Sequence, residues 1–500
     1  MTEVLILIIG ILSVTLFWRF RPPFYESTLL TRSESVFVAQ NYINRIIGVD
    51  VSTWKVYSNY WYDHEVVNRM HQLDLLEKWR SLLFDWGIVE SWRIRFVHEN
   101  NSIVVNINAN KEITFLHSNI RNESLYKDIS NKISTSQDII NLLKQQYGNK
   151  IWSRVEATGE GERNEDLSNI RHYWYTIKAD KIRMKFNVTV EDDRITQINN
   201  DTDINTDDIQ KVIRKEYRES ALNLTSFIAS LGATIVAVIS LIYTEQVTGI
   251  NTSLMLVGLM ILSMLLTAHD DIKLSIVNAF DSRLTLRSIY TVGILSAFMG
   301  VTAYSFLTFI LSLAGLNLAN NNDALTFQQP IDQLFVGIGV GFICLALSTV
   351  FFYLLQKRGY LRVSPELSSR STYLSGFKYR QSISMSMQSS LLEELTYRLL
   401  GVSLFMWLFN NELLALTITS VLWAFLHQGR GFSPPIFRWV QLILIGFAFG
   451  YIYLQYGFLA AFIAHFVHNF ILTSLPLFDY KLSKRKENPN AASNYIGSRN

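Results

Sequence analysis

The chain has a single cysteine and little charge for its length. Cys344 is the one cysteine among 500 residues, so an intramolecular disulfide and a cysteine-based zinc site are both excluded. Charged residues make up 17% of the sequence, and the formal net charge of +3 is too small to indicate nucleic-acid binding. The 49% hydrophobic content instead predicts a membrane protein that carries a polar domain.

The N-terminal apolar segment lacks the features of a cleaved signal peptide. No Lys or Arg precedes residues 4–18, and no small-residue cleavage site follows them. The segment is also shorter than the ~20 residues that cross a bilayer comfortably, so whether it spans the membrane stays open. We interpret residues 1–20 as an uncleaved membrane anchor.

Long apolar runs are absent from residues 24–220, which predicts a soluble domain. Two parts of it, 92–119 and 174–201, share an alternation of strand, turn, strand, turn and strand. Helical runs at 33–47 and 136–148 precede them, so we expect an α+β tandem repeat. The domain resembles the PepSY-type domains attached to some bacterial membrane peptidases. It could present substrate, inhibit an enzyme, bind a partner or only support the structure.

Long apolar segments begin after Ser220. Eight of them follow, at about 222–243, 250–268, 288–316, 333–356, 384–409, 412–428, 437–455 and 458–475. We therefore expect an all-α polytopic membrane protein over residues 221–480, with about eight core transmembrane helices. The N-terminal anchor makes nine candidate spans. The polar tail, 481–500, is predicted to be disordered.

Basic residues are unevenly distributed among the connections between these segments. Four connections lack Lys and Arg entirely: 244–249, 317–332, 410–411 and 456–457. The alternating connections carry them: Lys273, Arg283, Arg287, Lys357, Arg358, Arg362, Arg370, Lys378, Arg380, Arg430 and Arg438. Because Lys and Arg favour the cytoplasmic side, we expect a multi-pass protein of the cell membrane with its N-terminus outside and its soluble domain and C-terminus in the cytoplasm.

Ionisable side chains inside the late apolar segments are the main candidates for chemistry. Each such group costs at least ~2.5 kcal/mol to place in a membrane, so it requires a reason to be there. They form three motifs: Glu393, Glu394 and Arg398 as E-E-x-x-x-R; Trp423 and His427 as W-x-x-x-H; His465 and Asn469 as H-x-x-x-N. The three motifs lie in three different predicted spans.

Helix geometry separates the two carboxylates. Glu394 and Arg398 are four residues apart, so they lie on one helix face and can form an ion pair. Glu393 lies about 100° around the helix from Glu394, which leaves its carboxylate available for chemistry. His427 lies near the cytoplasmic end of its span. We therefore expect a polar cavity that opens toward the cytoplasm.

Two kinds of hydrolytic chemistry fit these residues. In the first, Glu393 acts as general base toward a water held also by His427, while His465 and Asn469 donate hydrogen bonds to the developing oxyanion. In the second, Glu393, His427 and His465 bind zinc as a two-histidine, one-carboxylate set with an open position for water, which would make the protein a metalloprotease. Both alternatives stay open at this point.

These motifs resemble those of the CAAX prenyl protease and bacteriocin-processing (CPBP, or ABI) family of intramembrane endopeptidases. The resemblance covers about 370–475 and implies a peptide-bond hydrolase. It implies the following roles: Glu393 activates water, Glu394 and Arg398 support it, His427 is the second water or metal ligand, and His465 and Asn469 stabilise the oxyanion. Trp423 stands where the family more often has Phe. His468 adds an imidazole three residues after His465 and competes with it for the same role.

Eukaryotic members of the family trim prenylated C-termini, but the Asn, Ile and Lys usage here is typical of bacteria, where such substrates are not expected. We expect a membrane-associated peptide or protein as substrate and the lipid bilayer as surroundings. A transporter, or an immunity or scaffold protein that uses the same polar cluster for binding, is the alternative.

Overall fold

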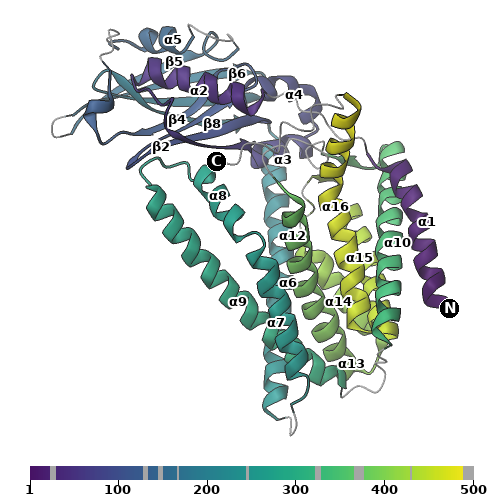
Figure 1. The fold of residues 1–500 in the computed structure, drawn as a ribbon. Helices are drawn as coiled ribbons and strands as arrows, with labels where there is room; N and C mark the ends of the chain where they lie inside the picture. Colours follow the sequence, from purple (N-terminus) through teal and green to yellow (C-terminus); the bar gives the residue numbers. More distant parts are fainter. Residues whose placement is uncertain are drawn as a thin grey trace.

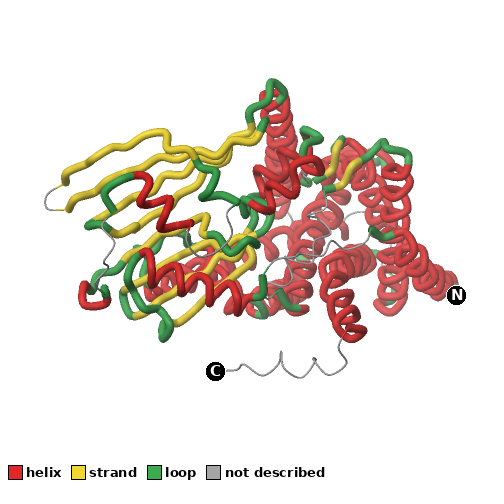
Figure 2. Tube along the Cα trace, turned by 90° about the horizontal axis from the view of Figure 1, so that it is seen from above, coloured by secondary structure: helices red, strands yellow, loops and turns green. Residues whose placement is uncertain are grey.

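The protein folds into a strand-rich domain that lies over one end of a helical bundle (Figure 1). The computed structural model describes residues 1–487 except 23–29, 128–132, 145–149, 166–167, 244–246, 321–327, 365–376, 428 and 430. We call residues 30–208 the sheet domain and residues 209–487 the helical bundle. The sheet extends to one side of the bundle, away from the N-terminus (Figure 2).

The sheet domain is built from two similar halves. Its eight antiparallel strands run in the order β1-β2-β3-β4-β8-β7-β6-β5, so two four-stranded meanders meet where β4 pairs with β8. The strands are β1 (Lys55–Trp61), β2 (Ser91–His98), β3 (Asn101–Asn108), β4 (Ile113–Asn119), β5 (Glu156–Glu165), β6 (Ser168–Ala179), β7 (Ile182–Glu191) and β8 (Arg194–Ile204). Each half has one strand more than the sequence predicts, because β1 and β5 at the sheet edges lack a clear apolar alternation.

Helices cover the outer face of this sheet. The first half contributes α2 (Arg32–Ile46), and the second contributes α5 (Ser136–Lys144). Both helices pack on the face that points away from the bundle, and their apolar residues share one core with the strands (Figure 1). Two shorter helices, α3 (His64–Gln72) and α4 (Leu76–Asp85), lie between β1 and β2.

All nine apolar segments that the sequence singles out are helical. The helices are α1 (Thr2–Phe20), α6 (Ile209–Ile242), α7 (Ile250–Leu265), α8 (Ala268–Asn278), α9 (Leu286–Asn320), α10 (Pro330–Lys357), α12 (Tyr379–Glu394), α13 (Ser403–Phe409), α14 (Glu412–Leu426), α15 (Ile436–Tyr456) and α16 (Phe458–Glu487). Within the described residues, six are long and apolar enough to cross a membrane, or seven if α7 and α8, bent by 44°, form one span. The chain is thus a multi-pass membrane protein.

Two segments depart from a simple span. Residues 384–409 divide into α12, a π-helical segment η3 (Leu395–Val402) and α13, while α14 has only 15 residues. A count of nine spans therefore stays a prediction.

At the C-terminal end of the chain, α16 continues to Glu487, so helix covers the first residues of the predicted disordered tail. The rest of that tail, 488–500, lies outside the described residues.

The sheet domain contacts the first of the basic connections between bundle helices. On β2, the buried Arg95 guanidinium donates to the carbonyl oxygens of Ala279 at 2.7 Å and Leu284 at 2.6 Å, in the connection between α8 and α9. On β4, His117 Nδ1 and Ser282 Oγ are 2.6 Å apart. These contacts join the first half of the sheet, through β2 and β4, to the bundle.

The sheet domain reaches two further basic connections. Asp74 forms an ion pair with Arg362, which follows α10. Asn68 accepts a hydrogen bond from the backbone N–H of Gly431, in the connection between α14 and α15. The three basic connections contacted in this way therefore lie at the end of the bundle that carries the sheet domain.

The N-terminal helix α1 packs closely against α10. A Cβ atom at Gly10 would lie 2.5 Å from the Cα and carbonyl oxygen of Gly339, so the two backbones meet where both residues are glycine. Small residues allow this approach between membrane helices, which associate through close packing. Nearer the sheet domain, the rings of Phe20 and Tyr353 lie 4.9 Å apart between their centroids.

We predict that Gly10→Ile separates α1 from α10, because the added side chain meets backbone that cannot rotate away. Overpacking of this kind costs about 1–3 kcal/mol. Disulfide crosslinking between F20C and Y353C, in a Cys344→Ala background, is expected to fall several-fold. Gly258→Ile is the matched control, because a Cβ there meets nothing within 4 Å. Equal crosslinking in both variants would show that α1 does not depend on this contact.

Candidate active site

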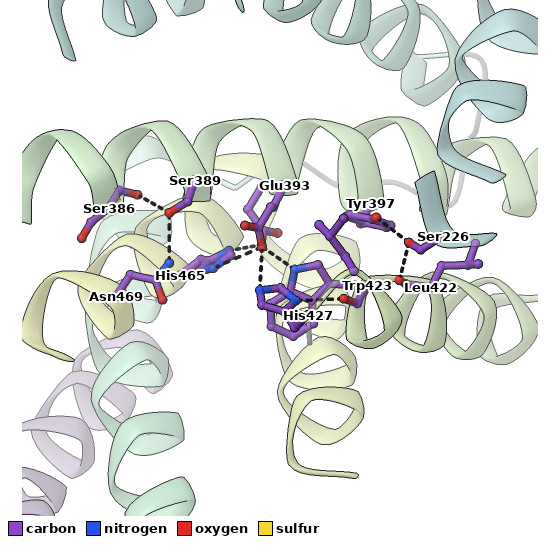
Figure 3. A network of polar contacts seen from close by, with 12 residues as sticks. Ser226, Ser386, Ser389, Glu393, Tyr397, Leu422, Trp423, His427, His465 and Asn469 are labelled. Atoms are coloured by element: carbon purple, nitrogen blue, oxygen red, sulfur yellow. Dashed lines mark hydrogen bonds and ion pairs between the residues drawn. The ribbon is translucent and has the colours of Figure 1, made fainter. Parts of the chain in front are cut away.

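One carboxylate oxygen lies among side chains from three helices. Glu393 is in the last turn of α12, Trp423 and His427 come from the end of α14, and His465 is on α16 (Figure 3). Glu393 Oε2 is 3.6 Å from His427 Nε2 and 3.8 Å from His465 Nε2. The indole Nε1 of Trp423 donates a hydrogen bond to the same oxygen at 2.6 Å. The side chain of Glu393 is 16% exposed, so water can reach it.

The carboxylate of Glu394 is fully buried inside the bundle. Arg398 Nη1 donates to Glu394 Oε1 at 2.9 Å, as the four-residue spacing predicts, and both side chains are buried. The other end of the guanidinium donates to the Gly446 carbonyl oxygen at 3.2 Å. Glu394 Oε1 also accepts a hydrogen bond from His465 Nδ1 at 2.7 Å. Glu394 therefore orients an imidazole as well as pairing with Arg398, a contact that the motif spacing does not indicate.

The hydrogen bonds define the tautomers of both histidines. The carboxylate of Glu394 only accepts, so the proton of its bond with His465 is on Nδ1 of the imidazole. His427 Nδ1 lies 3.0 Å from the carbonyl oxygen of Trp423, which likewise only accepts. A neutral imidazole has one N–H, so the Nε2 atom of each ring presents a lone pair toward Glu393. A water molecule beside these three acceptors can donate to two of them.

Asn469 lies beside this cluster. Its amide Nδ2 donates to Ser389 Oγ at 3.2 Å, and Ser389 precedes Glu393 by one helical turn on the same face of α12 (Figure 3). The amide carries a second N–H that can donate to a substrate. Of the two candidate imidazoles on α16, the structure brings His465 to Glu393, while His468 is buried elsewhere along the helix.

Side chains from neighbouring helices fix the end of α14. The helix ends at Leu426, and His427 is in extended conformation (φ −94°, ψ 121°), so the helix stops just before the end of the apolar segment at about 412–428. Carbonyl groups in the last turn of a helix need outside donors. Asn223 on α6 donates to the Leu426 carbonyl, and Trp439 Nε1 donates to that of His427 at 3.2 Å. These donors hold His427, and no motif in the sequence points to them.

The zinc alternative fits the structure less well than the water alternative. Among the described residues, no group of three or more His, Cys, Asp or Glu side chains is arranged to hold a metal ion. The Glu393 oxygen nearest both imidazoles also accepts the hydrogen bond of Trp423 Nε1 at 2.6 Å.

Comparisons with known proteins agree with this region of the chain. The model of the Rce1-like family, described as type II CAAX prenyl endopeptidase Rce1-like, matches residues 377–471, which hold all three motifs. The chain is also 40% identical over 478 residues to the sporulation-killing factor biosynthesis protein SkfC of Bacillus subtilis (strain 168). That alignment covers 95% of this chain and 96% of SkfC. No solved structure matches the chain. From the motifs, the helices that carry them and these similarities, we conclude that the chain belongs to the Rce1-like (CPBP) family of CAAX endopeptidases.

Proposed function

We propose that the protein is an intramembrane endopeptidase that hydrolyses a peptide bond of a membrane-associated peptide or protein. The observation that carries the proposal is the placement of the Glu393 carboxylate between the Nε2 atoms of His427 and His465, 3.6 and 3.8 Å away. A water held by Glu393 and His427 is polarised by both acceptors. Glu393 takes a proton as the water oxygen attacks the substrate carbonyl carbon, and it then passes that proton to the leaving amine.

His465 and Asn469 stabilise the oxyanion in this proposal. Since Nδ1 of His465 donates to Glu394, Nε2 can donate to an oxyanion only when the ring is an imidazolium, so the proposal requires His465 to take up a proton from solvent before the water attacks. The Glu394 carboxylate, 2.7 Å from Nδ1, stabilises that positive charge. The second N–H of the Asn469 amide adds a neutral donor one turn along α16. Glu394 and Arg398 thus support the reaction without contacting the substrate.

The similarity to SkfC supports a more specific role. That protein takes part, by its name, in the biosynthesis of sporulation-killing factor. We propose that this chain cleaves the precursor of a comparable factor at the membrane. An endopeptidase fits such a step because a precursor peptide needs one defined cut rather than complete digestion.

We predict that Glu393→Gln lowers cleavage of fluorescence-quenched amphipathic peptides by the purified protein about 10²- to 10⁴-fold, because a general base is lost. The carboxamide oxygen can still accept from Trp423, so the site geometry is kept. His427→Ala is expected to lower the rate as well. Glu412→Gln, at the exposed start of α14, is the control and keeps full activity. Full cleavage by both site variants would end this proposal.

The same assay separates the two hydrolytic alternatives. With 1,10-phenanthroline at millimolar concentration, wild-type cleavage is expected to stay within twofold of the untreated rate, since no step of the proposal uses a metal. A loss of activity that added zinc restores would instead favour zinc held by Glu393, His427 and His465.

We further propose that the site opens to the cytoplasm and that the chain crosses the membrane nine times. The support is the position of the basic connections at the sheet-domain end of the bundle. Protease added outside bacterial spheroplasts is therefore expected to leave the sheet domain intact, and to digest it after permeabilisation. Digestion of the sheet domain in intact spheroplasts would contradict the orientation.

A further inference from the structure

A second pocket lies at the junction of the sheet domain and the helical bundle. It encloses about 500 Å³. Its walls are the segment from Tyr62 to Arg69 in the sheet domain, the first turns of α6, and the single residues Ser364 and Gly431. None of the candidate catalytic residues lines it, so the pocket is separate from the site at Glu393.

The pocket combines negative charge with aromatic rings. Arg69 is within 2.6 Å of Glu65 and 3.2 Å of Glu216, so one guanidinium faces two carboxylates. With neutral histidine, the described residues that line the pocket therefore carry one net negative charge. Tyr62 and Tyr217 line it too, and Tyr217 is 73% exposed. Carboxylates beside exposed aromatic rings form a suitable site for a cationic side chain.

The walls of the pocket are continuous with the elements that hold His427. Gly431 follows His427 by four residues, and it is bonded on both sides: its N–H donates to Asn68 at 3.2 Å, and its carbonyl accepts from the Ser364 N–H at 2.8 Å. On α6, Ser220 in the pocket wall lies one turn before Asn223, whose amide donates to the carbonyl just before His427. A ligand in the pocket thus lies against Gly431 and Ser220, each close in sequence to His427 or to Asn223, one of the two donors that hold it.

We propose that this pocket binds a Lys or Arg side chain of the peptide substrate. The proposal rests on the endopeptidase function and adds a recognition element to it. Four residues of chain reach at most about 14 Å, which limits the distance from Gly431 to His427. A substrate in extended conformation therefore places its basic residue within roughly five residues of the bond that is cleaved. The basic segment lies at the membrane surface while the scissile bond is at Glu393.

Binding can be measured without cleavage. The full chain carrying Glu393→Gln is placed in phosphatidylcholine nanodiscs, and fluorescein-labelled peptides that share one apolar segment are titrated against it. The peptides differ only in a flanking pair, which is Lys-Arg, Ser-Ser or Glu-Glu. The Lys-Arg peptide is expected to bind about fivefold or more tightly than the Ser-Ser peptide, corresponding to one partly exposed ion pair, and to weaken with added salt. Empty nanodiscs correct for binding to lipid.

Two variants assign the effect to the pocket. Tyr217→Ala removes an exposed ring and leaves both ion pairs of Arg69 in place, so its effect does not come from a displaced domain. Glu65→Gln combined with Glu216→Gln removes both carboxylates and leaves Arg69, so the net charge of the lining residues changes from −1 to +1. Both are expected to abolish the preference for Lys-Arg, whereas Glu123→Gln, an exposed carboxylate outside the pocket, keeps it.

The outcomes separate this proposal from the proposed function. Equal affinity for the three peptides, or a preference unchanged in Tyr217→Ala and in the double variant, would overturn the assignment of the pocket. If the preference depends on the pocket residues while the wild-type chain cleaves none of the peptides, the recognition site stands and the endopeptidase function fails.

Discussion

The buried ion pair between Glu394 and Arg398 is the constraint on which the rest of the site depends. Separating such a pair leaves an uncompensated charge and costs about 3–5 kcal/mol, so neighbouring helices must satisfy it together. The Gly446 carbonyl accepts from Arg398, and His465 donates to Glu394. Gly446 allows α15 to pack closely against α14, because a Cβ atom at this position would lie only 2.9 Å from Ser420 Cβ on α14. The pair thus positions α12, α15 and α16.

Two adjacent carboxylates can serve different purposes because the helix turns them apart. Glu394 points into the bundle and is fully buried, whereas Glu393 is 16% exposed and faces two imidazoles. The π-helical segment η3 begins directly after them, and such segments are frequent at functional sites. The sheet domain contacts the connection that follows His427, where Asn68 accepts a hydrogen bond from the Gly431 N–H.

Local spacing predicts part of this arrangement, and tertiary contacts decide the rest. The Glu394–Arg398 pair and the separate orientation of Glu393 follow from 3.6 residues per turn. The apolar segments predict the helices and the short alternating runs predict most strands. Spacing within one segment cannot indicate that Trp423 donates to Glu393, or that Asn223 holds the end of α14, because those partners are distant in sequence. Spacing also cannot indicate that His465, rather than His468, is the imidazole that lies beside Glu393.

The central claim is that Glu393 activates water rather than attacking the substrate itself. Single-turnover cleavage in H₂¹⁸O, with mass analysis of the new carboxyl terminus and of the protein, tests it most directly. We expect one ¹⁸O atom in the product of the first turnover and unlabelled Glu393. A first-turnover product without ¹⁸O, together with ¹⁸O in the Glu393 carboxylate, would show a covalent intermediate and contradict the account.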